Sequence, residues 1–138
     1  MNINKIQFNI EKIDYDTYCG LLEWWASMSL GRTAEYFIIN KGMKNLLAFG
    51  IKYQNGYAEI CVKILALKQI KKAVSFCEKS IIAYLAQQNI RIIILSTIDY
   101  YITSKIFSSL KFDKIVTYRD HCKLKGRIYD IAVFEKNI

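Results

Sequence analysis

The sequence lacks proline altogether, and no glycine occurs between Gly56 and Gly126. It has no low-complexity tract and no internal repeat, so nothing marks a linker and we expect residues 1–138 to form one domain. No apolar run approaches the roughly 18 residues that a membrane-spanning helix needs. The first residues interleave charge with apolar side chains and contain no signal-peptide core. We therefore expect a cytoplasmic protein with no membrane partner.

Metal ligands and nucleophile motifs are also scarce. The chain has one histidine, His121, and four cysteines that lie far apart and form no Cys-x-x-Cys pair. A zinc site would have to gather most of these side chains from scattered elements, so we expect no metal and interpret the cysteines as small apolar side chains. His121 lies between Asp120 and Cys122 in a predicted loop, but neighbours in sequence rarely converge as a catalytic set. No Gly-x-Ser-x-Gly elbow is present for a serine nucleophile.

Positive charge, by contrast, is plentiful, and it is concentrated in the second half of the chain. The formal net charge is +8; residues 1–62 carry six basic and six acidic side chains, and residues 63–138 carry fourteen basic and six acidic ones. A one-sided basic surface attracts anionic partners. A phosphorylated cofactor, an acidic carrier protein, membrane phosphates and nucleic acid all satisfy this charge, so charge alone does not choose between them.

Hydrophobic periodicity predicts the order of the secondary structure as β-α-β-β-β-α-β-α-β-β. Apolar residues alternate with polar ones where strands are expected, and they recur every three or four residues where helices are expected. Strands are predicted at residues 6–10, 36–39, 46–53, 57–65, 90–95, 114–119 and 128–135, and helices at 16–31, 69–88 and 100–110. Hairpins mixed with crossovers indicate an α+β fold, a mixed and mainly antiparallel twisted sheet flanked by helices.

The helical patterns also predict which side chains face the core. The 69–88 helix should turn Glu78 to solvent together with its lysines. In the first helix Trp24 and Trp25 point about 100° apart, so only one lies deep in the core. The other either extends the apolar face or lines an acceptor site or a homodimer interface. The core face predicted for the 100–110 helix consists of Ile102, Ile106, Phe107 and Leu110.

This order of elements resembles that of the GCN5-related N-acetyltransferase superfamily. Residues 110–112, LKF, are similar to the superfamily's "GF" turn with the glycine replaced, and residues 126–131, GRIYDI, are similar to the "G-x-Y-x-D-hydrophobic" start of its final strand. Residues 4–9, NKIQFN, resemble the "N-K-x-x-Q-F-N" phrase of the acyltransferase-like region in FkbH-type proteins, where Thr97 and Tyr100 would match "T-x-x-N". No phosphatase-like half is present, so the loading reaction of those enzymes is not implied.

The resemblance implies a site for the pyrophosphate of acetyl-CoA or another acyl-CoA at the start of the 69–88 helix. The superfamily pattern there is "R/Q-x-x-G-x-G/A", because glycine lets a phosphate approach the backbone, but residues 68–75 contain no glycine. The ammonium groups of three lysines would replace the lost donors; alternatively, they form a solvated face. The residues expected to bind the cofactor are Leu65, Ala66, Leu67, Lys68, Lys71, Lys72, Ala73 and Val74.

The catalytic assignment departs from the superfamily pattern. By spacing, Phe107 stands where many members have the tyrosine that protonates the leaving thiolate, and phenylalanine cannot donate a proton. Tyr100 or Tyr101 on the same helix could take that role, although packing is the simpler role for a tyrosine. Glu59, on the strand before the cofactor loop, is the first candidate for the general base that deprotonates the acceptor; a solvated strand glutamate is its simpler interpretation.

Three hypotheses follow. The first is an acyltransferase that uses acyl-CoA, with acetyl-CoA favoured, and acts on an amine or hydroxyl of a small molecule or of a substrate bound to an acyl carrier protein. Residues 105–127, with seven basic and two acidic side chains, could dock such an acidic carrier. The second is a non-catalytic binding or assembly module of the same fold, favoured by the missing glycines and by Phe107. The third, nucleic-acid binding, finds no recognisable motif in the sequence.

Overall fold

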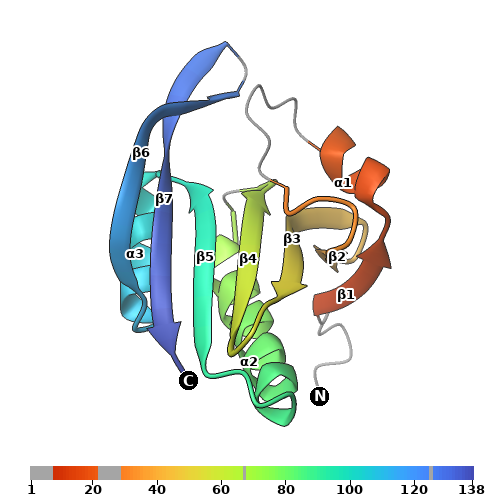
Figure 1. Cartoon of the computed structure of the whole chain (residues 1–138). Coiled ribbons are helices and arrows are strands. Elements are labelled where there is room, and N and C mark those ends of the chain that lie inside the picture. Colours follow the sequence, from red (N-terminus) through yellow and green to blue (C-terminus); the bar gives the residue numbers. More distant parts are fainter. Residues whose placement is uncertain (1–7, 22–28, 67, 125) are drawn as a thin grey trace, which may run out of the picture.

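The computed structural model describes residues 8–21, 29–66, 68–124 and 126–138. Seven strands form one sheet in the order β1-β2-β3-β4-β5-β7-β6 (Figure 1). The order of elements along the chain is the predicted one, and the mixed α+β architecture is confirmed. The elements are β1 (Phe8–Ile13), α1 (Tyr15–Gly20), β2 (Glu35–Lys41), β3 (Lys44–Tyr53), β4 (Tyr57–Ile64), α2 (Ile70–Gln87), β5 (Ile92–Ile98), α3 (Tyr101–Ser109), β6 (Asp113–Leu124) and β7 (Arg127–Asn137).

One pair of neighbouring strands, β4 and β5, is parallel, and the other pairs are antiparallel. The parallel pairing ends at Val62 and Thr97, although both strands continue for one or two more residues. The Thr97 hydroxyl closes this last rung by donating to the Val62 carbonyl at 3.2 Å. Beyond it the two strands diverge (Figure 1), so the sheet opens at the carboxyl ends of β4 and β5.

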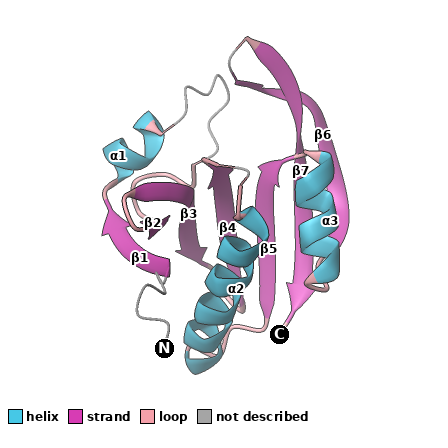
Figure 2. Ribbon diagram, turned by 180° about the vertical axis from the view of Figure 1, so that it is seen from behind, coloured by secondary structure: helices cyan, strands magenta, loops and turns pink. Residues whose placement is uncertain are grey.

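The two longer helices cover one face of the sheet (Figure 2). Because successive strand residues point to opposite faces, alternate β4 residues such as Ile60 and Val62 pack under α2 in the main core, with Phe107 of α3. The residues between them point the other way: Cys61 joins Tyr18 of α1 in a second buried cluster. None of the helices in the described part of the chain is long and apolar enough to cross a membrane.

The first helix is shorter than predicted. Asp14 caps it, with its carboxylate accepting the Thr17 N–H at 2.7 Å. It ends at Gly20 because Leu21 has an extended backbone (φ −78°, ψ 115°), so the prediction of one helix running through to residue 31 is wrong at this point. The predictions made for Trp24, Trp25 and Leu67, and for the parts of the first strand and first helix at residues 6–7 and 22–28, lie outside the described residues.

The last hairpin is longer than predicted, and this corrects the placement of His121. Strand β6 continues past Arg119 to Leu124, so His121 lies within the strand instead of a loop. A β-bulge between Tyr118 and Cys122 absorbs the extra residues, and Asp120 there has a φ of 51°. Cys122 is fully buried while His121 is exposed, so the two side chains do not share a site.

Helix α3 buries a threonine where an isoleucine was predicted. Ile102 is 39% exposed, whereas Thr103 is inaccessible to solvent. The Thr103 hydroxyl accepts the Tyr100 N–H at 3.0 Å and lies within donating distance of the Ile98 and Tyr100 carbonyls, at 3.0 and 2.7 Å. These bonds satisfy the polar group in the core and fix the start of α3 to the end of β5.

Candidate functional site

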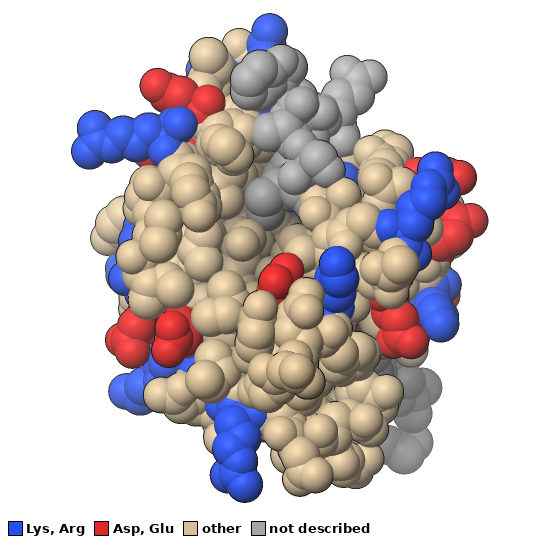
Figure 3. Space-filling model, in the orientation of Figure 1, with Lys and Arg blue, Asp and Glu red and all other residues tan. Residues whose placement is uncertain are grey.

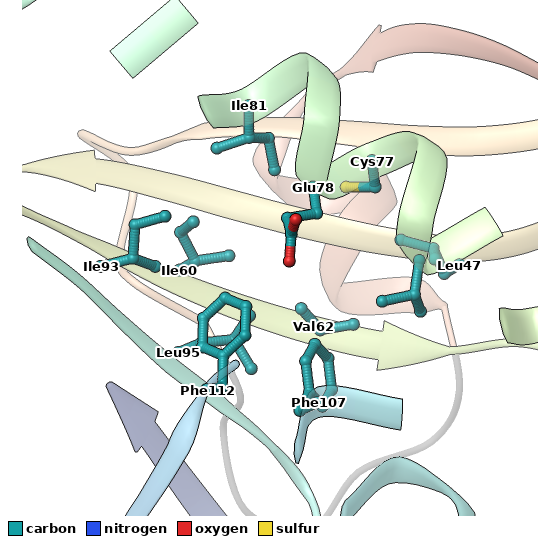
Figure 4. A pocket seen from close by; sticks show the side chains of 11 residues that line it. Leu47, Ile60, Val62, Cys77, Glu78, Ile81, Ile93, Leu95, Phe107 and Phe112 are labelled. Atoms are coloured by element: carbon teal, nitrogen blue, oxygen red, sulfur yellow. The ribbon is translucent and has the colours of Figure 1, made fainter. Parts of the chain in front are cut away.

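A small apolar cavity lies between α2, α3 and the strands β4 and β5 (Figure 4). Its volume is about 30 Å³. It adjoins the part of the sheet where β4 and β5 diverge, so the opening in the sheet is flanked by apolar side chains on the helix-covered face. The residues that line the cavity are Leu47, Ile60, Val62, Val74, Cys77, Glu78, Ile81, Ile93, Leu95, Phe107 and Phe112.

Glu78 is the charged residue among those that line this cavity, and it points from α2 into it (Figure 4). Its carboxylate pairs with Lys136 of β7 at 3.2 Å, and the two side chains are 15% and 16% exposed. Lys136 also donates to the Leu110 carbonyl at 2.7 Å. The prediction that Glu78 faces solvent is therefore wrong, because a partner from the far end of the chain compensates its burial.

In the connection from β4 to α2, two backbone N–H groups are already hydrogen-bonded within the fold. The N–H groups of Leu65 and Ala66 both donate to the Leu46 carbonyl of β3, at 2.9 and 3.1 Å. These two predicted cofactor residues therefore have no N–H left for a phosphate in this structure. Leu67, the third, lies outside the described residues.

The first turn of α2 holds N–H groups that the helix itself leaves without an acceptor. The first helical bond runs from the Ala73 N–H to the Gln69 carbonyl at 3.1 Å, so the N–H groups of residues 70–72 have no acceptor inside the helix. The first turn contains no acidic residue, and no side chain caps it. Lys71 and Lys72 are exposed here, and Lys68 is exposed just before the helix. Positive charge thus gathers at the positive end of the helix dipole, an arrangement that an anion would relieve.

Ala73 and Val74, also predicted to bind the cofactor, have buried side chains, 0% and 4% exposed. They pack into the main core, and Val74 lines the cavity. The predicted set thus divides into exposed lysines and core residues. Sequence reasoning missed that the helix begins at Ile70 and that the residue before it, Gln69, has a left-handed backbone (φ 66°); no motif signals either feature.

On the opposite face of the sheet, a buried lysine follows the predicted base along β4. Glu59 is partly exposed, whereas Lys63 is 3% exposed; both share the face of Cys61 because they are separated by even numbers of residues. The Lys63 ammonium donates to the carbonyls of Tyr18 and Leu21 at 2.8 and 3.0 Å and lies 4.3 Å from the centre of the Tyr18 ring. Burial lowers the pKa of Lys63. A charge inside the apolar run of residues 58–65 is the sequence signal that could have identified this site.

The buried thiol beside Lys63 does not provide a ready nucleophile. Cys61 lies 3.1 Å from the Tyr18 hydroxyl, and burial raises the pKa of the thiol to about 11. It therefore stays protonated at neutral pH, whereas a nucleophilic cysteine needs its thiolate. Among the described residues, no group of three or more His, Cys, Asp or Glu side chains is arranged to hold a metal ion.

The two tyrosines predicted as acids differ in their surroundings. Tyr100 is half-buried at the start of α3, its ring lies 5.2 Å from that of Tyr129, and burial raises its pKa. Tyr101 is 81% exposed and faces solvent beside Lys105. Phe107 is 3% exposed and packs edge-on against Phe112 at 5.5 Å. The structure thus brings Tyr100 to the end of β5 near the opening of the sheet, and it leaves Tyr101 on the surface.

Solved structures share this architecture over nearly the whole chain. The ribosomal-protein-S18-alanine N-acetyltransferase from Escherichia coli superposes with a TM-score of 0.68 at 11% identity, covering 96% of this chain and 94% of that one. The IAA acetyltransferase from Bacillus cereus gives 0.67 at 11%, covering 96% and 100%. An N-acetyltransferase from Staphylococcus aureus gives 0.64 at 10%, covering 95% and 98%. The chain has the GCN5-related N-acetyltransferase fold. No protein-family model and no curated protein matches the sequence.

Identities this low establish the fold but not the chemistry, which depends on the residues of this chain. Two features meet at the carboxyl end of β4 in this acetyltransferase fold: the divergence of β4 and β5 after Val62 and Thr97, and the basic, acid-free start of α2. The first could admit an extended group between two strand edges, and the second could hold an anion beside it. Val62, the last paired residue of β4, precedes Ile70, the first residue of α2, by eight residues.

Proposed function

We propose that this protein is an acyl-CoA-dependent acyltransferase, with acetyl-CoA as the donor, that acts on an amine or a hydroxyl of a small molecule or of a carrier-bound substrate. The observation that carries the proposal is the first turn of α2. The N–H groups of residues 70–72, which have no acceptor inside the helix, and the exposed Lys71 and Lys72 lie next to the divergence of β4 and β5, in an acetyltransferase fold. A pyrophosphate at this turn would neutralise the charge that the helix start accumulates.

The residues of the chain suggest how binding and proton transfer would be divided. Lys68, Lys71 and Lys72 would attract the phosphates as point charges, while the N–H groups of residues 70–72 direct them. When bound, acetyl-CoA supplies a thioester, and attack by the acceptor breaks its C–S bond. We assign Glu59 to accept the proton that the acceptor loses and Tyr100 to protonate the departing thiolate, because both are only partly buried.

A non-catalytic binding module is the second candidate, and two observations favour it. Phe107 occupies the usual position of the acid and is buried against other rings. The N–H groups of Leu65 and Ala66 are engaged by Leu46. Four predictions from the sequence stay hypotheses: similarity to FkbH-type proteins, docking of a carrier by residues 105–127, a homodimer and a cytoplasmic location. On the face that Figure 3 shows, charges of both signs are interspersed and form no single basic patch. This face therefore offers no continuous basic surface to nucleic acid.

Thermal unfolding with and without millimolar acetyl-CoA tests the proposal. A ligand at about 100 times its Kd adds roughly 2.7 kcal/mol to the free energy of unfolding, which should raise the midpoint by several degrees. The shift should disappear in Lys71→Glu/Lys72→Glu. It should persist in Lys79→Glu/Lys105→Glu, which makes the same charge change at exposed positions away from the helix start. Each variant serves as its own ligand-free reference.

Two further measurements complete the test. Free adenine nucleotides at the same concentration should give a smaller shift, because they lack the thioester arm. Release of free thiol from acetyl-CoA in the presence of an amine panel separates an enzyme from a module that only binds. No shift at any acetyl-CoA concentration would refute acetyl-CoA as the donor and leave a carrier-bound donor or the binding module.

A further inference from the structure

A second, larger hollow lies on the helix-covered face of the sheet, between β1, β2, β3 and the carboxyl-terminal half of α2. Its volume is about 370 Å³. Figure 2 shows that β1 and β2 extend to one side of α2, which leaves this part of the sheet uncovered by the helix. Tyr84 lines the hollow at the end far from the start of α2. It lies fourteen residues after Ile70, or about 21 Å along the helix axis. We name this hollow the β1–β3 groove.

Aromatic rings form much of the β1–β3 groove. The rings of Phe37 and Phe49 stack with centroids 5.2 Å apart and an interplanar angle of 22°; Phe49 is buried in the main core, and Phe37 is the partly exposed member of the pair. The rings of Tyr53 and Tyr84 lie 6.3 Å apart, and these two side chains are 37% and 47% exposed. Ile10 of β1 is 36% exposed at the same groove. A hollow of several hundred Å³ lined by aromatic side chains with a few polar groups is the usual form of a small-molecule site.

The polar groups of the groove favour an anionic substituent on the ligand. Lys12 and Glu35 form a long ion pair of 3.9 Å, with side chains 67% and 44% exposed. Such a pair contributes little stability, so Lys12 can exchange Glu35 for a ligand carboxylate at small cost. The Lys12 side chain is also the more exposed of the two, and so the more accessible to a ligand. Hydroxyl groups from Ser80, Tyr53 and Tyr84 add neutral hydrogen-bonding capacity.

We propose that the β1–β3 groove binds a small aromatic carboxylate, with its flat ring against the side chains of Phe37, Tyr53 and Tyr84 and its carboxylate paired with Lys12. The ring geometry selects a planar ligand, since offset stacking and edge contacts with several aromatic side chains are available at once. The site is separate from the start of α2, and the proposal is independent of acyl transfer.

The probe is 1-naphthoate, whose binding to the full chain is followed by ligand-observed NMR or by calorimetry. Ile10→Trp should fill the groove from β1 and weaken binding by about tenfold or more, as loss of a ring-sized contact area implies. Ile128→Trp is the matched control: Ile128 is 61% exposed on β7, toward the other edge of the sheet, and this variant should bind like the parent. Ser80→Phe fills the groove from α2 and decides the question if Ile10→Trp does not fold.

Charge and location are tested with the same probe. Lys12→Gln should weaken 1-naphthoate binding several-fold while leaving the binding of neutral 1-naphthol unchanged, and 1-naphthylmethylamine should bind more weakly than 1-naphthoate. Saturating acetyl-CoA should not displace the probe. The proposal is overturned by the absence of saturable 1-naphthoate binding, by binding that survives both filling variants, by a preference for the amine, or by displacement with acetyl-CoA.

Discussion

The end of α3 offers a sharp test of the structure, because a lysine there adopts a backbone conformation that suits glycine. Lys111 has a φ of 71°. Its N–H donates to the Ser108 carbonyl at 3.1 Å, and the next N–H, of Phe112, reaches back to the Phe107 carbonyl at 2.9 Å. These two bonds, with the Phe107–Phe112 ring contact at 5.5 Å, make a Schellman motif. Glycine is the residue usually found at the position of Lys111, and it is also the residue in the "GF" turn that residues 110–112 resemble.

Lys111→Gly should therefore stabilise the protein. Removing the Cβ from a left-handed backbone should stabilise the folded state by about 1–2 kcal/mol. Glycine also loses more conformational entropy on folding, which lowers the free energy of unfolding by about 0.5–1 kcal/mol. The net gain is about 0.5–1 kcal/mol. Unfolding entropy of about 2.1 cal/mol/K per residue amounts to about 0.29 kcal/mol/K over 138 residues, so the midpoint should rise by about 2–3 °C.

Calorimetric melting of the parent, Lys111→Gly and Lys111→Ala measures this effect. Alanine removes the same charge as glycine but keeps the Cβ, so the difference between the two variants isolates the backbone term. Lys111→Ala should melt close to the parent. A Lys111→Gly variant that melts no higher than Lys111→Ala would show that this residue does not hold a left-handed backbone in solution.

Two further perturbations test the second buried cluster. A Cβ added at Gly50 would lie 2.5 Å from Cε1 of the buried Tyr36 ring. Gly50→Ala should therefore lower the free energy of unfolding, measured in urea melts, by about 1–3 kcal/mol. Gly20→Ala is the control and should not be destabilised in this way, because its added Cβ meets nothing within 4 Å. Because burial raises the pKa of Cys61 from 9.0 to about 11, the unfolded chain loses this proton first, and stability should fall as pH rises from 9 to 11. The lowered pKa of Lys63 opposes this trend; the fall should be less steep in Cys61→Ala, and an unchanged slope would contradict the assignment.

The elements with strong periodicity were predicted to within two residues. The long helix, predicted at 69–88, is observed at Ile70–Gln87, because its apolar stripe repeats over five turns and faces one continuous core. The strands β3 and β4 are found where alternation predicted them. Local pattern was sufficient here because each of these elements buries one face along its whole length.

The errors arise where a distant partner decides the outcome. Glu78 is turned inward by Lys136, 58 residues away in sequence, and the burial of Lys63 depends on carbonyls more than 40 residues away. Strand β6 is an edge strand whose residues 113–121 are exposed, so the polar run around His121 resembles a loop although it continues the ladder. A pattern within one segment carries no information about such partners.

The absence of glycine from the β4–α2 connection can now be interpreted in terms of geometry. A glycine-rich loop brings phosphate close to several successive N–H groups. Here the N–H groups of Leu65 and Ala66 already donate to the Leu46 carbonyl. A Cβ at these two positions therefore excludes no phosphate, whereas the glycine positions of the superfamily pattern fall later, within residues 68–75, where α2 begins. What the connection offers an anion is the first turn of α2 and its lysines, a site that selects by charge more than by shape. If the protein uses acyl-CoA, its binding energy must come from Lys68, Lys71, Lys72 and the adjacent apolar opening, and these are the residues on which a functional comparison with other members of the fold should concentrate.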